Sequence, residues 1–254
     1  MPYLGFSKSS LVPAFKNAAR DDPDFSTKIL VWDHNWDNPS YPTNVLNDIQ
    51  NDTDANASVV GSAWHSYSDD PHPENLGLVY KSHPDKGIYF TEASGHYDPT
   101  KQKADTCFAG DLIWGIENVS IGATRNYAKT VLYWNLALDP NGGPRLIEDD
   151  ECRMRGIVTI DPLNETFNNT TEYYVLGHLS KFVDPGARRI NSTSNASVDN
   201  VAFLNPDDSI VLLVLNNDDT NPKSFDVQWR DQHFSYELQK QSVVTFKWNQ
   251  TATA

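Results

Sequence analysis

The chain has 254 residues, 39% of them hydrophobic, which is enough for a sizeable core in one large or two smaller domains. Its formal net charge of -14 argues against nucleic acid or an anionic membrane as a partner, because both carry negative charge. No apolar run approaches the length of a membrane-spanning helix, so we expect no integral membrane segment.

The first half of the chain alternates strand-like and helix-like segments. Residues 11–19, 41–48 and 106–124 read as helical. Around them lie runs of β-branched and aromatic residues that end in polar or aromatic groups: KILVWDHNWD from Lys28, VVGSAWHSY from Val59, GIYFTEASG from Gly87 and AKTVLYWNLAL from Ala128. The alternation predicts parallel strands joined by crossover helices, with the reactive groups at the carboxyl ends of the strands.

The pattern changes after the fourth of these runs. Residues 141–144 form a turn signal, residues 148–151 an acidic loop, and residues 172–183 have apolar groups at helical spacing before Asp184-Pro185-Gly186. Short runs of β character follow: NVAFLN from Asn200, SIVLLVLNN from Ser209, SFDVQW from Ser224, FSYELQ from Phe234 and SVVTFKW from Ser242. These runs predict an antiparallel sandwich, and we divide the chain into domains 1–186 and 187–254.

The strings WDHNWD, YFTEASG, WNLALDPNGGP and LGHLSKFVDPG give nearly all of the chain a resemblance to the C-terminal half of glycoside hydrolase family 30 enzymes. This family includes glucosylceramidases and fungal β-1,6-glucanases. The resemblance implies an α/β plus β fold, namely the second half of a (β/α)8 TIM barrel followed by a β-sandwich domain. Four strands cannot close a barrel of eight, so we expect further barrel sequence upstream of Met1. In the resembled family the sandwich also takes strands from the N-terminal end.

Glu92 places an ionisable carboxylate at the end of an otherwise apolar strand-like segment. Hydrolysis of a β-glycoside with retention needs a nucleophilic carboxylate and an acid about 5 to 5.5 Å away from it. The resemblance implies that Glu92 is the nucleophile, because the family has its nucleophilic glutamate in strings similar to FTEASG. From its position alone, Glu92 could instead cap a helix or form a surface ion pair.

The acid/base has no clear counterpart. The family supplies it from an Asn-Glu pair at the end of the fourth barrel strand. The only Asn-Glu pair here is Asn164-Glu165, which does not follow an apolar strand, so we do not assign it and expect the acid/base upstream of Met1.

Three further residues match the family's sugar-binding positions. His65 and Tyr67 stand two apart, so on a strand they face the same side, and they match the His and Tyr near the nucleophile and the glucosyl hydroxyls. Trp134 resembles the tryptophan that forms the wall of the subsite for the cleaved sugar, where an aromatic plane stacks on a pyranose. For all three, packing in an ordinary core is the alternative.

Asp33, His34 and Trp36 end the first strand and form a polar and aromatic cluster. Asp33 is the best candidate of the three for binding sugar hydroxyls, whereas His34 and Trp36 fit a site or a core equally well. Trp64 has the opposite strand parity from His65 and is expected in the core. Asp149 matches a substrate-facing loop of the family only loosely.

The sequons indicate a secretory route. Nine asparagines have Ser or Thr two positions on, an excess over the roughly three or four expected by chance: Asn51, Asn56, Asn118, Asn164, Asn168, Asn169, Asn191, Asn195 and Asn249. We therefore expect N-linked glycans and an extracellular location, although residues 1–10 do not resemble a signal peptide. Cys107 and Cys152 could form one disulfide or stay free.

The leading interpretation is a retaining β-glucosidic hydrolase, an endo-β-1,6-glucanase, that needs no metal or organic cofactor. The alternatives are a glucosylceramidase, and a noncatalytic glycan-binding homologue, which the missing acid/base supports. A mechanism-based probe that labels Glu92 distinguishes the enzymes from the binding protein. A fragment with open sheet edges and no stable fold of its own is a further possibility.

Overall fold

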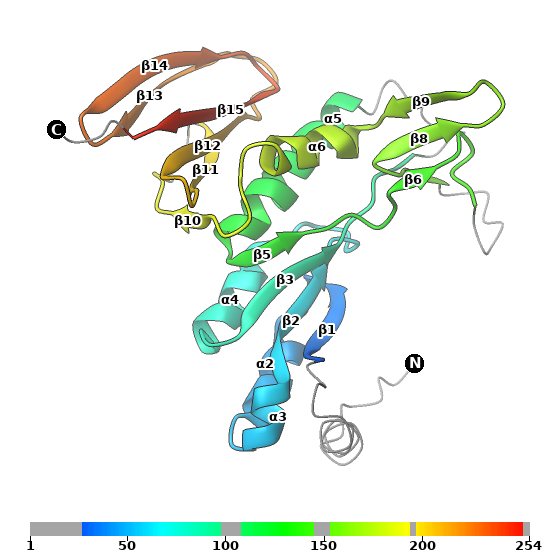
Figure 1. Ribbon diagram of the computed structural model, residues 1–254, viewed down its shortest axis with the longest axis vertical. Helices are drawn as coiled ribbons and strands as arrows, with labels where there is room; N and C mark the ends of the chain where they lie inside the picture. The colour runs from blue at the N-terminus through cyan, green and yellow to red at the C-terminus, as the bar shows by residue number, and fades with distance from the viewer. Residues whose placement is uncertain (1–26, 98–107, 145–152, 194–196, 251–254) are drawn as a thin grey trace. The chain divides into compact units, whose positions relative to one another are not determined.

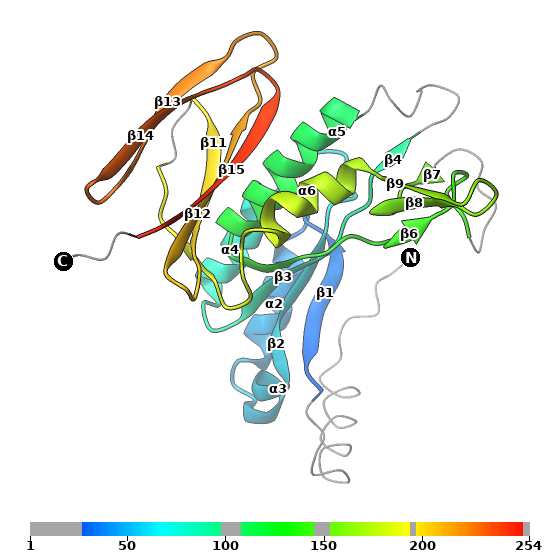
Figure 2. The same cartoon turned by 45° about the horizontal axis from the view of Figure 1, so that its top comes forward.

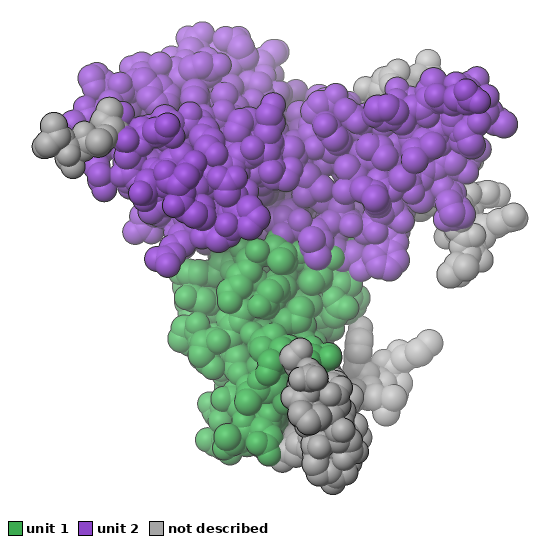
Figure 3. All heavy atoms as spheres, in the orientation of Figure 1, with its two compact units in different colours: residues 1–91, 126–130 green, residues 92–125, 131–254 purple. Residues whose placement is uncertain are grey.

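The computed structural model describes residues 27–97, 108–144, 153–193 and 197–250. By its internal contacts the chain divides into two compact units (Figure 3). The first unit comprises residues 1–91 and 126–130, and the second comprises residues 92–125 and 131–254. The helix expected at residues 11–19 lies outside the described residues.

A four-stranded sheet forms the centre of the first unit, with only the last residues of two strands assigned to the second. The order is β1 (Ile29–Asn35), β2 (Val59–His65), β3 (Gly87–Glu92) and β5 (Ala128–Val131), with β1 and β2 parallel as predicted (Figure 1). Between the strands lie helices α2 (Ser40–Ile49), α3 (Thr53–Ser58) and α4 (Glu74–Ser82). Helix α2 confirms the helix expected at residues 41–48, whereas α3 and α4 were not among the predicted helices.

Helix α3 is short, and side chains satisfy the backbone groups at both of its ends. The Asp52 carboxylate accepts hydrogen bonds from the N–H groups of Asp54 and Ala55, at 3.2 and 3.1 Å. At the other end the buried Lys86 ammonium donates to the carbonyl oxygens of Asn56 and Val59, at 2.6 and 2.8 Å. Burial lowers the pKa of Lys86, and the charge of Asp85 opposes this shift.

The second unit contains three helices and several small sheets within the described residues. Helix α5 (Phe108–Trp114) continues into the π-helix η2 (Gly115–Ala123), and α6 (Thr171–Ser180) follows later in the chain. A three-stranded sheet joins β6 (Ala137–Leu138), β8 (Val158–Asp161) and β9 (Thr166–Asn169). Strand β4 (His96–Tyr97) pairs with β7 (Arg153–Met154).

The C-terminal part of this unit confirms the predicted antiparallel strands. One sheet has the order β10 (Arg188–Ile190), β11 (Asp199–Leu204), β12 (Ser209–Asn216) and β15 (Ser242–Asn249). A hairpin of β13 (Lys223–Trp229) and β14 (Gln232–Leu238) completes the sandwich (Figure 2). All five of the β runs predicted after residue 186 are found as strands.

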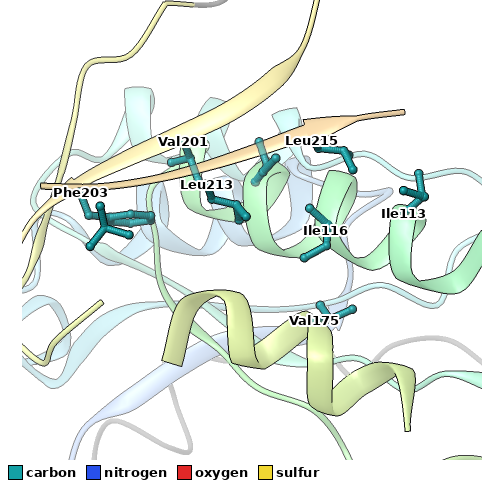
Figure 4. Close-up of a cluster of buried hydrophobic side chains, with 9 residues drawn as sticks. Ile113, Ile116, Val175, Val201, Phe203, Leu213 and Leu215 are labelled. Atoms are coloured by element: carbon teal, nitrogen blue, oxygen red, sulfur yellow. The ribbon is translucent and has the colours of Figure 1, made fainter. Parts of the chain in front are cut away.

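Strand β12 is buried on both faces because it is a central strand between two hydrophobic clusters. Val211, Leu213 and Leu215 belong to a cluster that includes side chains of α5, η2 and α6 (Figure 4). The alternate residues Leu212 and Val214 belong to a second cluster, which includes Leu238 of β14. The continuous apolar run of this strand therefore reflects burial on both sides of one sheet.

Two predicted elements have different bounds in the structure. The run from Ala128 ends as a strand at Val131, and its last residues form β6 in a different sheet. The helix expected at residues 172–183 starts at Thr171 and ends at Ser180. In both cases apolar residues continue past the end of the element, so hydrophobic spacing alone did not show where it stops.

Candidate active site

The end of strand β1 is distorted where the first candidate residues lie. Trp32 and Asp33 have φ angles of 84° and 48°, and the pairing of β1 with β2 shifts register between Trp32 and His34. The Trp32 indole N–H donates to the carbonyl oxygen of Asn35 at 2.8 Å, and its ring lies 4.9 Å from the Tyr41 ring. This local β-bulge changes which side chains face the end of β2.

Asp33 forms a small hydrogen-bonded group with residues from the two neighbouring strands. Its Oδ1 lies 3.0 Å from His65 Nε2 and accepts a hydrogen bond of 3.0 Å from the Thr91 hydroxyl. The Asp33 side chain is 67% exposed whereas that of His65 is 12% exposed. The largely buried His65 therefore holds the group in place, while the Asp33 carboxylate stays accessible to solvent. An accessible carboxylate of this kind can accept hydrogen bonds from sugar hydroxyls.

Aromatic rings extend this group along the ends of β1 and β2. The His65 ring lies edge-on to His34 at 6.4 Å and to Tyr67 at 6.0 Å. The Tyr67 backbone N–H donates to the Asn35 side chain at 3.1 Å, and Tyr67 is 37% exposed. Strand β2 ends at His65, so Tyr67 lies beyond it, yet the two rings are in contact.

Trp64 of β2 and Trp36, which directly follows β1, are core residues. Trp64 is fully buried, as its strand parity predicted, and its indole N–H donates to Ser62 at 2.8 Å. Trp36 is also fully buried, with its ring 5.8 Å from that of Phe90. For Trp36, which the sequence left open, burial excludes contact with a sugar.

Glu92 and Trp134 belong to the second unit. Glu92 is the last residue of β3 and is half-buried, following a strand body in which Ile88 and Phe90 are buried. The Trp134 backbone N–H donates to the carbonyl oxygen of Ala93 at 2.8 Å, and Trp134 as a whole is 59% exposed. An exposed tryptophan tied to the residue after Glu92 is suited to stack on a sugar ring.

Several other candidates are placed elsewhere or lie outside the described ranges. Asn164 and Glu165 occupy the exposed turn between β8 and β9, where Glu165 has a φ of 53°. The Asp161 carboxylate accepts hydrogen bonds from Asn164 and Leu163, which lower the pKa of Asp161. This turn explains the Asn-Glu pair as local structure. Asp149, Cys107 and Cys152 are outside the described residues.

Sequence reasoning missed an ion-pair network that contacts Gly95, three residues after Glu92. The Arg155 guanidinium contacts Glu172 Oε1 at 2.7 Å and Asp111 Oδ2 at 2.5 Å, with Arg155 and Glu172 both largely buried. Burial alone lowers the pKa of Arg155, but the hydrogen bonds and charges of Glu172 and Asp111 outweigh it and raise this pKa. No sequence pattern indicated the partners of Arg155.

Other parts of the described chain fit the chemistry less well. A cavity of about 830 Å³ lies in the sandwich, but the one carboxylate among its lining residues is Asp226, whereas glycoside hydrolysis needs two. No group of three or more His, Cys, Asp or Glu side chains is placed to hold a metal ion in the described ranges. No helix found there is long and apolar enough to cross a membrane.

Family models match the two parts of the chain in order. Residues 4–183 match the glycosyl hydrolase family 30 TIM-barrel domain, and residues 186–246 match the glycosyl hydrolase family 30 beta sandwich domain. An endo-1,6-beta-D-glucanase of Neurospora crassa is 31% identical over 217 residues, which are 83% of this chain and 41% of the relative. Putative glucosylceramidase 2 of Caenorhabditis elegans is 30% identical over 257 residues, 94% of this chain and 45% of that protein.

Solved structures give the same relationship. An endo-beta1,6-glucanase matches with a TM-score of 0.76 and 30% identity over 94% of this chain and 52% of that one. A protein of Salmonella typhimurium matches with a TM-score of 0.79 at 23% identity, covering 94% of this chain and 50% of that one, which shows a shared fold. The chain thus spans about half the length of the relatives it matches.

Proposed function

The chain belongs to glycoside hydrolase family 30, and from this membership we propose that the protein is a retaining glycoside hydrolase that cleaves β-1,6-glucan internally. The observation that carries the proposal is the position of Glu92, a half-buried carboxylate at the end of a strand whose body is buried. The substrate follows from two relatives of about 30% identity, both named as endo-1,6-glucanases.

In this mechanism the Glu92 carboxylate attacks the anomeric carbon and the bond from that carbon to the leaving oxygen breaks. An acid/base residue, which we assign to none of the described residues, gives its proton to the leaving oxygen. The same group then deprotonates a water that releases the sugar from Glu92. Trp134 stacks on the sugar, and Asp33, His65 and Tyr67 bind its hydroxyls.

The proposal is tested by Glu92→Gln in the full-length protein. We expect hydrolysis of β-1,6-glucan to fall at least about a thousandfold, because an amide cannot act as the nucleophile, with glucan binding within about threefold of wild type. A 2-deoxy-2-fluoroglucoside probe should label wild type at Glu92, as peptide mass spectrometry would detect. Glu165→Gln is the matched control at an exposed glutamate and should keep full activity. Retained activity in Glu92→Gln would remove the assignment.

A glucosylceramidase is the second candidate, supported by the 30% identity to a putative glucosylceramidase of Caenorhabditis elegans. Both activities place a β-glucosyl unit at the nucleophile, so the labelling experiment does not separate them. Parallel assays of kcat/KM on β-1,6-glucan and on glucosylceramide in detergent micelles do. A higher value on the lipid would replace the glucanase proposal.

We also propose an extracellular location and the domain division 1–186 and 187–254. The excess of sequons supports the location. The order of the elements supports the division, because helix α6 ends at Ser180 and only antiparallel strands follow it in the described residues. Activity in the culture medium, compared with that in washed cells, tests the location.

A further inference from the structure

The segment that follows Glu92 is held on two sides by main-chain hydrogen bonds. Ala93 accepts from the N–H of Trp134 at 2.8 Å, and Gly95 accepts from the N–H of Arg155 at 2.8 Å. The Ser94 hydroxyl donates to the carbonyl oxygen of Arg155 at 3.3 Å. Arg155 therefore contacts residues 93–95, the segment that directly follows Glu92 and that is also hydrogen-bonded to Trp134.

The side chain of Arg155 is fixed from two helices. Its Nε and Nη2 donate to the carboxylate of Glu172, with a shortest distance of 2.7 Å, and Glu172 lies in the first turn of α6. Nη2 also donates to Asp111 of α5 at 2.5 Å. Only 11% of the Arg155 side chain and 4% of the Glu172 side chain are exposed. Because a guanidinium is planar and rigid, these hydrogen bonds fix the orientation of the group as well as the position of its charge.

Gly95 packs directly against this ion pair. A Cβ atom at Gly95 would lie 1.7 Å from Glu172 Oε1 and 2.3 Å from Arg155 Nη2. Neither group could give way without breaking the pair, because the side chains of both are largely buried. The network therefore contacts the backbone three residues after Glu92, with no side chain in between.

A contribution to stability alone is a weak reason for such a network. Taking a guanidinium and a carboxylate out of water costs several kcal/mol per ion, and well-packed apolar residues often serve a fold as well or better. A buried ion pair with defined hydrogen-bond directions that packs against Gly95 does, however, hold the backbone at that point in one geometry. A loop that bears a nucleophile needs such geometry, since a misplacement of about 1 Å can cost a hundredfold in rate.

We propose that Arg155 is a positioning residue: through Glu172, Asp111 and Gly95 it holds the loop after Glu92 so that the carboxylate is aimed at the anomeric carbon. This role rests on the proposed function of Glu92. Arg155 does not touch the sugar in this proposal, so it acts on the chemical step and leaves sugar binding intact.

The test uses the full-length protein and the 2-deoxy-2-fluoroglucoside probe, whose saturation kinetics separate the limiting labelling rate from the concentration for half-saturation. Arg155→Lys keeps the positive charge but loses the planar guanidinium that bonds Glu172 and Asp111 together. Gly95→Ala keeps every charge, but its added Cβ displaces the Arg155–Glu172 ion pair. For both we expect the limiting rate to fall about 10- to 100-fold, with half-saturation within about threefold of wild type.

Arg125→Lys is the matched control. Arg125 is also part-buried, in the same unit, but it donates to Ser192 and Asn200 of the sandwich part. We expect the probe to label Arg125→Lys at the wild-type limiting rate, even if this substitution lowers the melting temperature as much as Arg155→Lys does.

The outcomes separate the two proposals. Wild type that is not labelled at Glu92 overturns the proposed function and this role with it. Labelled wild type, with Arg155→Lys and Gly95→Ala reacting at the wild-type limiting rate, overturns the positioning role alone. An equal loss of rate in Arg125→Lys also overturns it, because general destabilisation would then explain the effect. If Arg155→Lys does not fold, Gly95→Ala decides.

Discussion

The strained residues at the end of β1 bring Asp33 into contact with His65 and Thr91. A non-glycine residue in the left-handed region costs on the order of 1–3 kcal/mol, and such conformations persist only where other contacts hold them. Here the hydrogen bond from Trp32 to Asn35 and the ring contact with Tyr41 provide that hold. A regular strand at this point would turn Asp33 elsewhere, so the bulge serves the site.

At this same scale we predict the effect of Asp33→Ala. Oδ1 of Asp33 contacts both His65 Nε2 and the Thr91 hydroxyl, so the substitution removes a partner from two neighbours at once. The kcat/KM on β-1,6-glucan should fall about 10- to 100-fold, because the carboxylate that we propose to bind a sugar hydroxyl is lost and its two neighbours lose a hydrogen-bond partner. Asp33→Asn should keep part of this activity, because an amide oxygen in the place of Oδ1 retains both contacts, and the exposed Asp37→Ala is the control. Activity of Asp33→Ala within about twofold of wild type would contradict the prediction.

A hydrogen bond of the partly buried His178 joins helix α6 to strand β15. His178 Nδ1 lies 2.9 Å from the Thr245 hydroxyl, and that hydroxyl lies 3.2 Å from the carbonyl oxygen of His178. Burial lowers the pKa of His178 below its usual value near 6.5. The folded protein therefore favours the neutral ring, which makes this contact sensitive to acid.

The sign of the resulting pH dependence follows from proton linkage. Below about pH 6.5 the unfolded chain binds a proton at His178 that the folded chain does not, so the free energy of unfolding falls as pH falls. The decline ends once pH drops below the lowered pKa. Urea unfolding at pH 7.5 and 5.5 should show a smaller loss for His178→Gln than for wild type. Exposed His233→Gln should behave as wild type, and equal losses in all three would refute this role.

The whole molecule carries sequons that differ in their surroundings. Asn164, Asn168, Asn169 and Asn191 are exposed. Asn118, by contrast, lies in the π-helix and donates to the carbonyl oxygen of Trp114 at 3.0 Å, while its sequon partner Ser120 is fully buried. A glycan on Asn118 would have to break this hydrogen bond and make room beside a packed helix.

We therefore predict glycans on the exposed sequons and none on Asn118 when the full-length protein is made in a eukaryotic secretory pathway. Glycopeptide mass spectrometry before and after enzymatic deglycosylation gives the occupancy of each site. Asn118→Gln should leave the glycosylated mass unchanged, whereas Asn191→Gln, at an exposed sequon, should lower it by one glycan. An occupied Asn118 would show that the helix forms only after glycan transfer or opens to accept it.

The sequence by itself determined where most strands lie and that the strand-like run of β3 ends in a carboxylate, Glu92. Alternation of side chains and turn residues are local properties, so β11 to β15 could be predicted from short runs, and Glu92 from the polar end of an apolar one. The recognised strings supplied the expected fold, which the family models and solved structures confirm.

The tertiary structure alone decided the rest. Whether Trp36 is buried, where β5 stops and how β1 bulges depend on neighbouring strands that a local pattern does not contain. Arg155 meets Glu172 and Asp111 across 17 and 44 residues of sequence, and a backbone fold has to bring them together before their charges can pair. Local periodicity fixes the elements, whereas the groups that aim a side chain come from distant segments whose contacts exist only in the folded chain.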